Sequence, residues 1–132
     1  MRPVALGLAV ALAGAGPAEG VASPGPRDDY VLHCSGCHGP TGRGVPGTTP
    51  SLRALGPLGD APGGRAYLAR VPGVAQAPLD DARLARLLNW VLAELSGAPA
   101  APPYDAAEIG ALRREPLRDT RAARAALAVP SP

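Results

Sequence analysis

Two cysteines and a histidine stand close enough together in this chain to do chemistry as a unit. The stretch from Cys34 to His38 reads CSGCH, and C-x-x-C-H is the attachment signature of a c-type haem. Two thiols at this spacing can add to the two vinyl groups of one porphyrin, and the imidazole that follows can ligate the iron. The stretch therefore predicts one haem c per chain, bound covalently through Cys34 and Cys37, with His38 as the proximal iron ligand.

Two other chemistries use similar residues. A thioredoxin-like redox pair shares the C-x-x-C spacing, but it lies near a βαβ pattern that this sequence lacks. Zinc could take the two cysteines together with His33 and His38. Tetrahedral zinc wants ligands from separated positions, however, and neighbours such as His33 and Cys34 point in different directions. Haem is therefore the favoured interpretation.

The composition agrees with a small protein built around a cofactor. The 132 residues include no phenylalanine, one tryptophan and three tyrosines, beside 17 glycines and 17 prolines. A chain of this length buries a modest share of its surface, so a buried haem would supply missing apolar bulk. The net charge is only +2, which gives no reason to expect nucleic acid as a partner.

Residues 1–22 have the pattern of a secretory signal peptide. Arg2 supplies a positive charge, an apolar run extends from Val4 to Ala15, and small residues follow up to Ala22. The run is shorter than the roughly 20 residues that a bilayer span needs, so cleavage is favoured over anchoring. We therefore expect a periplasmic protein, which would touch a membrane only if the signal stays uncleaved.

Short helices are expected to position the motif. Residues 23–27 are predicted to be a linker, and Asp28-Asp29 opens a helix that ends in the haem motif. Residues 39–59 are dense in Gly and Pro and predict a loop. Residues 65–70 predict a helical turn that Val71-Pro72-Gly73 breaks.

The strongest helical period lies between Asp80 and Ser96. Asp80 is a suitable N-cap and Gly97 a suitable stop. The apolar residues of this stretch share one helix face, and they are Leu84, Leu87, Leu88, Val91, Leu92 and Leu95.

A shorter helix is expected over residues 105–114. Asp105 and Glu108 have the spacing of a capping box, and Ile109 and Leu112 form the apolar side. From Pro116 onward the sequence is rich in Ala and Arg and has little apolar surface to bury. That end of the chain is predicted to be a loosely held or disordered tail.

Together these features resemble a class I c-type cytochrome of the monohaem family. The features that carry the resemblance are Tyr30, the CSGCHG stretch, Gly42-Arg43-Gly44, a proline-rich loop and a last amphipathic helix with Trp90. The resemblance implies an all-α fold in which about three to four helices and long loops wrap one haem. It assigns residues 28–97 to the cytochrome domain and residues 98–132 to a C-terminal extension with a short helix and a flexible tail.

The resemblance also implies partners for the haem. In this family the proximal histidine donates its second N–H to the carbonyl of a proline about a dozen residues later, and Pro50 matches that position, with Pro46 as the second choice. Such a bond orients a ligating imidazole and raises its basicity. Trp90 is expected to pack against the haem edge.

The chain departs from the family at the sixth iron ligand, which is usually a methionine. The only methionine is Met1, and Val71, ahead of Pro72, stands where the ligand is expected. Valine cannot donate to iron, so the sequence leaves the distal ligand unknown.

Few other side chains could donate on that side. Gln76 lies in the same loop as Val71 and is a weak candidate, and Tyr67 or Tyr104 could ligate as a phenolate. His33 shares a helix with the motif and would need an unusual backbone. A five-coordinate or water-ligated iron is the leading expectation.

The expected function is one-electron transfer between redox proteins, without enzymatic turnover. The donor would be a dehydrogenase and the acceptor an oxidase or reductase. One alternative is a small cytochrome subunit of a larger periplasmic oxidoreductase, docked through the segment from Ala98 onward. The other is a ligand-binding or peroxidatic haem protein with an open distal site, although only Gln76 offers a polar group for distal acid–base chemistry.

Overall fold

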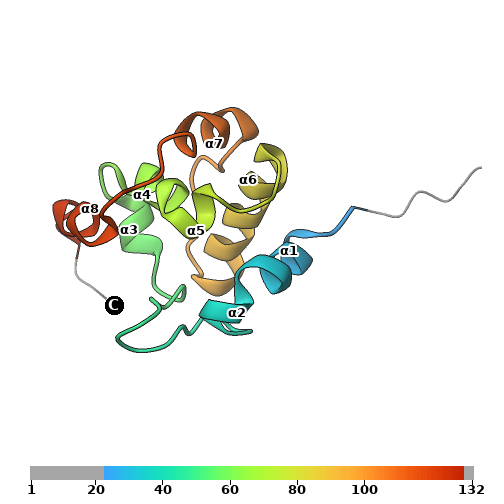
Figure 1. Cartoon of the computed structure of the whole chain (residues 1–132), viewed down its shortest axis with the longest axis horizontal. Helices are drawn as coiled ribbons and strands as arrows, with labels where there is room; N and C mark the ends of the chain where they lie inside the picture. The colour runs from blue at the N-terminus through green and yellow to red at the C-terminus, as the bar shows by residue number, and fades with distance from the viewer. Residues whose placement is uncertain (1–22, 130–132) are drawn as a thin grey trace, which may run out of the picture.

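Short helices make up nearly all the regular structure of the computed structural model, which describes residues 23–129 (Figure 1). Their bounds are α1 Pro26–His33, α2 Ser35–His38, α3 Gly56–Asp60, α4 Gly64–Arg70, α5 Pro72–Ala75, α6 Asp81–Trp90, η1 Val91–Leu95, α7 Ala106–Leu112 and α8 Thr120–Ala126. Within residues 23–129 the only β pairing is a single bridge between Val45 and Thr49. The all-α expectation is confirmed for this part of the chain. The predicted signal peptide lies outside the described residues.

Helix α6 and the turn η1 that continues it form the centre of the fold. The Asp80 carboxylate caps α6 by accepting the Arg83 N–H at 2.8 Å. The predicted apolar face forms the core, with Leu95 the only member of that face left partly exposed. The end differs from the prediction because η1 is a π-helical turn, in which the Ser96 N–H reaches the Val91 carbonyl at 3.1 Å. None of the helices within residues 23–129 is long and apolar enough to cross a membrane.

Helix α1 packs across α6 through one aromatic side chain. Tyr30 is 1% exposed, and its ring centroid lies 5.5 Å from that of Trp90. Beside it, the buried Asp29 carboxylate forms an ion pair with Arg83 of α6. These contacts hold the helix that leads into the CSGCH stretch against the centre of the protein.

The start of α1 differs from the prediction. The helix begins at Pro26 with Gly25 as its N-cap, two residues before the predicted opening at Asp28-Asp29. Proline suits the first helical position, where its missing N–H is not needed. Asp28 instead lies in the first turn, where its carboxylate accepts the Gly25 N–H at 3.0 Å.

Helical structure is also more extensive in the middle of the chain than predicted. The turn expected over residues 65–70 is present as α4. The break predicted at Val71-Pro72-Gly73 is confirmed, because α4 ends at Arg70 and Val71 has an extended ψ, but Pro72 starts a further helix, α5. Likewise α3 begins at Gly56, inside the region 39–59 that was expected to be all loop.

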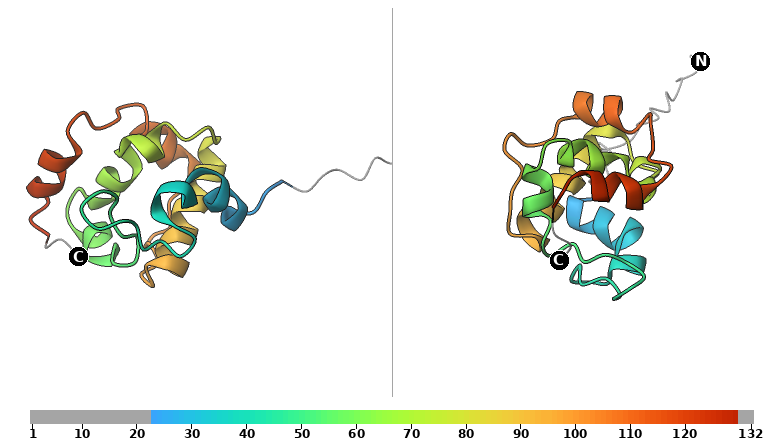
Figure 2. Two further views of the ribbon diagram at one scale, coloured as in Figure 1. Left: turned by 60° about the horizontal axis from the view of Figure 1, so that its bottom comes forward. Right: turned by 90° about the vertical axis from the view of Figure 1, so that its left-hand side faces the viewer.

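The C-terminal extension is built into the core. Helix α7 lies against α6 and α4 (Figures 1 and 2), and Tyr104 and Ile109 are 4% and 0% exposed. Residues 120–126 form helix α8, capped by Asp119, where the sequence predicted a loosely held or disordered tail. Helix α8 buries no residue of its own, although Leu127 after it packs against the core.

Candidate functional site

The CSGCH stretch lies at the junction of two helices. Cys34 ends α1, where its N–H donates to the Tyr30 carbonyl at 2.9 Å, while Cys37 and His38 belong to α2. Both cysteines are free thiols, Cys34 half-buried and Cys37 exposed. Neither sulfur is therefore consumed by a disulfide.

The Cys34 thiol lacks the character of a reactive redox cysteine. Burial, and after it the charges of Asp29 and Cys37, raises the pKa of Cys34 above its ordinary value. Cysteines that act as redox nucleophiles have lowered pKa values, because the thiolate is the attacking form. The environment of Cys34 thus argues against the thioredoxin-like alternative.

The zinc alternative is not supported either. Within residues 23–129, no three His, Cys, Asp or Glu side chains come together in a group that could hold a metal ion. His33 lies in the last turn of α1 and is exposed. Four neighbouring residues of a helical stretch do not converge on one tetrahedral point.

His38 is oriented by the loop that follows it. Its Nδ1 lies 3.0 Å from the carbonyl oxygen of Pro50. A carbonyl can only accept, so Nδ1 carries the proton, and in the neutral imidazole the lone pair is then on Nε2. This is the arrangement of an imidazole that ligates a metal through Nε2. Of the two prolines that the resemblance suggested, Pro50 makes the contact.

The loop that carries Pro50 is tied back to the motif at several points. The Gly44 N–H donates to the His38 carbonyl at 2.8 Å, and the Tyr30 hydroxyl donates to the Gly39 carbonyl at 2.5 Å. Farther along, the Leu55 N–H donates to Ser96 Oγ at 2.9 Å, directly after η1. The loop is therefore held both by α2 and by the end of the central helix.

Gly44 makes this loop geometry possible. Its φ is +67°, and a Cβ at this position would lie 2.3 Å from the Thr49 carbonyl oxygen and 2.6 Å from that of Pro50. Only glycine allows the backbone to approach the Pro50 carbonyl so closely. Gly44 was noted in the sequence as part of the resemblance. That its backbone lies against the Pro50 carbonyl could be seen only in the folded loop.

The candidates for the distal side are dispersed around α5. Val71 is half-buried at the bend between α4 and α5, and Gln76, directly after α5, is exposed. Tyr67 is half-buried on α4 and packs against the core. None of these positions supplies a sulfur or imidazole donor, so the distal ligand stays open.

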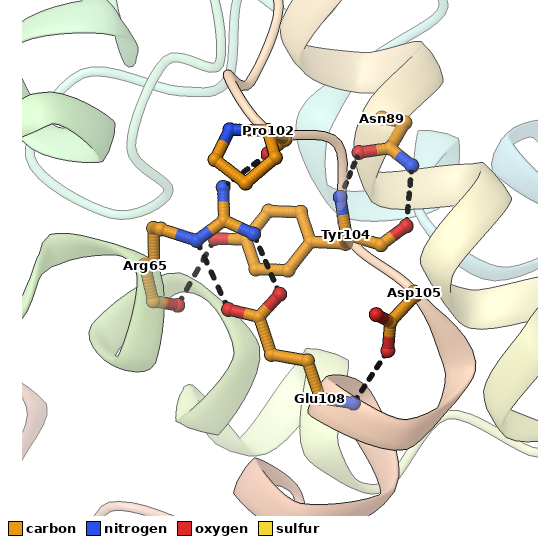
Figure 3. A network of polar contacts seen from close by, with 6 residues as sticks. All are labelled: Arg65, Asn89, Pro102, Tyr104, Asp105 and Glu108. Atoms are coloured by element: carbon orange, nitrogen blue, oxygen red, sulfur yellow. Dashed lines mark hydrogen bonds and ion pairs between the residues drawn. The ribbon is translucent and has the colours of Figure 1, made fainter.

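Tyr104 is not available as a phenolate ligand. Its hydroxyl donates to the Arg65 carbonyl at 3.0 Å, and the Arg65 guanidinium lies over its ring, 4.1 Å from the centroid (Figure 3). The amide of Asn89 pairs with both backbone polar groups of Tyr104. Burial raises the pKa of Tyr104 to about 12, so its phenol stays neutral.

The polar residues around Tyr104 also alter the capping box predicted at the start of α7. Asp105 caps α7 by accepting the Glu108 N–H at 2.8 Å, as the capping box requires. The Glu108 carboxylate does not accept the Asp105 N–H, because it accepts two hydrogen bonds from the Arg65 guanidinium at 2.9 and 2.6 Å (Figure 3). A bidentate ion pair with a guanidinium is stronger than a bond to a neutral N–H.

The donor set fits a covalently attached haem on the proximal side of its iron. Two free thiols stand beside an imidazole whose Nδ1 faces the Pro50 carbonyl, which directs Nε2 to a metal. Trp90 packs against Tyr30, and its contact with a haem edge stays a prediction. No protein-family model matches this sequence, and no curated protein matches it either.

Proposed function

We propose that this chain is an exported monohaem c-type cytochrome with the class I fold, which carries single electrons between redox proteins. The observation that carries the proposal is the hydrogen bond from His38 Nδ1 to the Pro50 carbonyl, beside two free thiols in C-x-x-C-H spacing. When bound, the haem supplies a one-electron Fe(III)/Fe(II) couple.

The chain's own residues would bind and orient the group. In each attachment the S–H of Cys34 or Cys37 adds across a vinyl C=C bond, so a C–S and a C–H bond form and no oxidant is consumed. His38 would ligate through Nε2, held by Pro50. The crossing of α1 over α6, with Tyr30 against Trp90, supports the class I arrangement because it fixes the helix that carries the motif.

One alternative is favoured by a specific feature, the lack of a sulfur or imidazole donor around α5. An open distal side would bind CO or similar small ligands. The alternative of a subunit docked through the segment from Ala98 onward is less favoured. Tyr104 and Ile109 of that segment are buried in the core, so these side chains cannot contact a partner. Electron transfer needs only an exposed haem edge and a small docking surface.

We expect the chain to keep haem through denaturation when it is produced with its own N-terminus in bacteria that mature c-type cytochromes. Cys34→Ala combined with Cys37→Ala should abolish covalent haem, because no thioether can form. His33→Ala is the matched control and should load normally, since His33 is exposed. Haem staining of denaturing gels and the pyridine haemochrome spectrum measure the retained haem.

A wild-type chain that emerges without covalent haem, in cells that load a control cytochrome, would refute the proposal. With haem bound, the reduced protein's spectrum is then recorded under CO. Reversible reduction with no CO shift supports a closed electron carrier, and a CO shift supports the ligand-binding alternative.

A further inference from the structure

We propose that residues 113–117, which follow α7, clamp the segment 70–81, and that Arg113 is the positioning residue of this clamp. The inference rests on the proposed function, because segment 70–81 contains Val71 and Gln76, the positions expected on the distal side of the haem. It assigns to the C-terminal extension a part in shaping that side of the site.

Arg113 holds the second half of the segment through three backbone carbonyls. Its Nε donates to Ala75 at 2.9 Å, its Nη1 to Leu79 at 2.7 Å and its Nη2 to Ala77 at 2.5 Å. Nη1 also contacts the Asp81 carboxylate at 3.2 Å. The Arg113 side chain is only 16% exposed, so these bonds are largely shielded from water.

The first half of the segment is held by the same stretch of chain. Arg70, at the end of α4, donates from Nε to the Glu115 carbonyl at 2.6 Å. In return the Leu117 N–H donates to the Arg70 carbonyl at 2.8 Å. Residues 113–117 thus contact the segment at Arg70, before Val71, and again at residues 75–81, around and after Gln76.

The chemistry of these contacts requires a guanidinium. Its donors lie in one rigid plane and can reach three carbonyls at once, whereas an ammonium is a point charge on a flexible stem. Lysine at this position would keep the positive charge and lose the geometry. The clamp therefore depends on the shape of Arg113 more than on its charge.

The exposed Arg114 provides a matched comparison. It is adjacent to Arg113 and carries the same charge, yet no hydrogen bond or ion pair to it is present within residues 23–129. Both substitutions remove one positive charge. An effect seen in Arg113→Ala but not in Arg114→Ala is therefore caused by loss of the Arg113 hydrogen bonds and not by the change in net charge.

The test measures hydrogen–deuterium exchange of the backbone N–H groups of the non-proline residues in 71–79 of the full-length holoprotein, together with its spectrum, its potential and its CO kinetics. Arg113→Ala should speed exchange in residues 71–79 at least tenfold, with Arg113→Lys between it and wild type and Arg114→Ala unchanged. In the same variants only the Arg113 substitutions should shift the haem spectrum, the potential or the CO association rate.

Three outcomes distinguish the clamp, its effect on the distal side of the haem, and the binding of haem itself. Unchanged exchange in folded Arg113→Ala overturns the clamp, and if that variant does not fold, unchanged exchange in Arg113→Lys overturns it instead. Faster exchange with identical haem spectrum, potential and CO kinetics overturns the link to the distal side while leaving the cytochrome proposal intact. A wild-type chain without haem refutes the proposed function, and exchange in the apoprotein still reports on the clamp.

Discussion

A chain that ends after Gly97 should have no cooperative unfolding transition. It would lack Tyr104 and Ile109, which are 4% and 0% exposed in the core against α6, and the Arg113 contacts as well. Removing a buried isoleucine side chain alone costs about 2–5 kcal/mol, and the whole stability of a small domain is about 5–15 kcal/mol. Circular dichroism during heating and in urea would measure the loss.

A chain that ends after Arg118 is the control for this truncation. It lacks α8, which buries no residue of its own, and the partly buried Leu127. We expect it to unfold cooperatively, with a loss of about 1–2 kcal/mol from that one apolar contact. If both truncated chains unfolded alike, the core role of α7 would be contradicted.

The second large effect is expected from Gly44→Ala. A non-glycine residue at φ +67° costs about 1–2 kcal/mol, and the new Cβ would lie 2.3 Å from the Thr49 carbonyl oxygen. The backbone must then shift, so the total loss should exceed about 3 kcal/mol. The shift would also move the Pro50 carbonyl away from His38 and loosen the hold on the imidazole.

Gly47→Ala separates the clash from the backbone strain. Gly47 has a φ of +75°, but a Cβ there would meet no atom within 4 Å, so only the loss of about 1–2 kcal/mol is expected. Urea unfolding measures both losses, and the NMR signal of the His38 Nδ1 proton reports the bond to Pro50. Equal effects of the two substitutions would mean that the close approach at Gly44 is unimportant.

Local patterns predicted much of the fold. The Asp80 cap and the apolar face of α6 could be predicted because both depend on residues within a few turns of one helix. Helix α8 was missed because its apolar surface is small, although Asp119 as an N-cap and the run of alanines were usable signs. The π-helical end of the central helix could not be predicted, because hydrophobic spacing does not distinguish it from an α-helical turn.

The candidate site was predicted in part. The spacing of Cys34, Cys37 and His38 is a property of five adjacent residues, and the resemblance to class I cytochromes pointed to Pro50. The shape of the loop around Gly44 brings Pro50 to His38. That shape depends on contacts between residues far apart in the loop and cannot be derived from residue spacing.

Features that depend on only a few neighbouring residues could be predicted before folding was considered: the CSGCH stretch, the caps at Asp80 and Asp105, and the core face of α6. Only the packing of distant elements pairs Glu108 with Arg65 and places Arg113 against the carbonyls of residues 75, 77 and 79. These contacts join residues 34 to 43 positions apart in the chain. Local spacing sets which face of a helix is apolar, but only the packing of whole helices sets which distant polar groups meet.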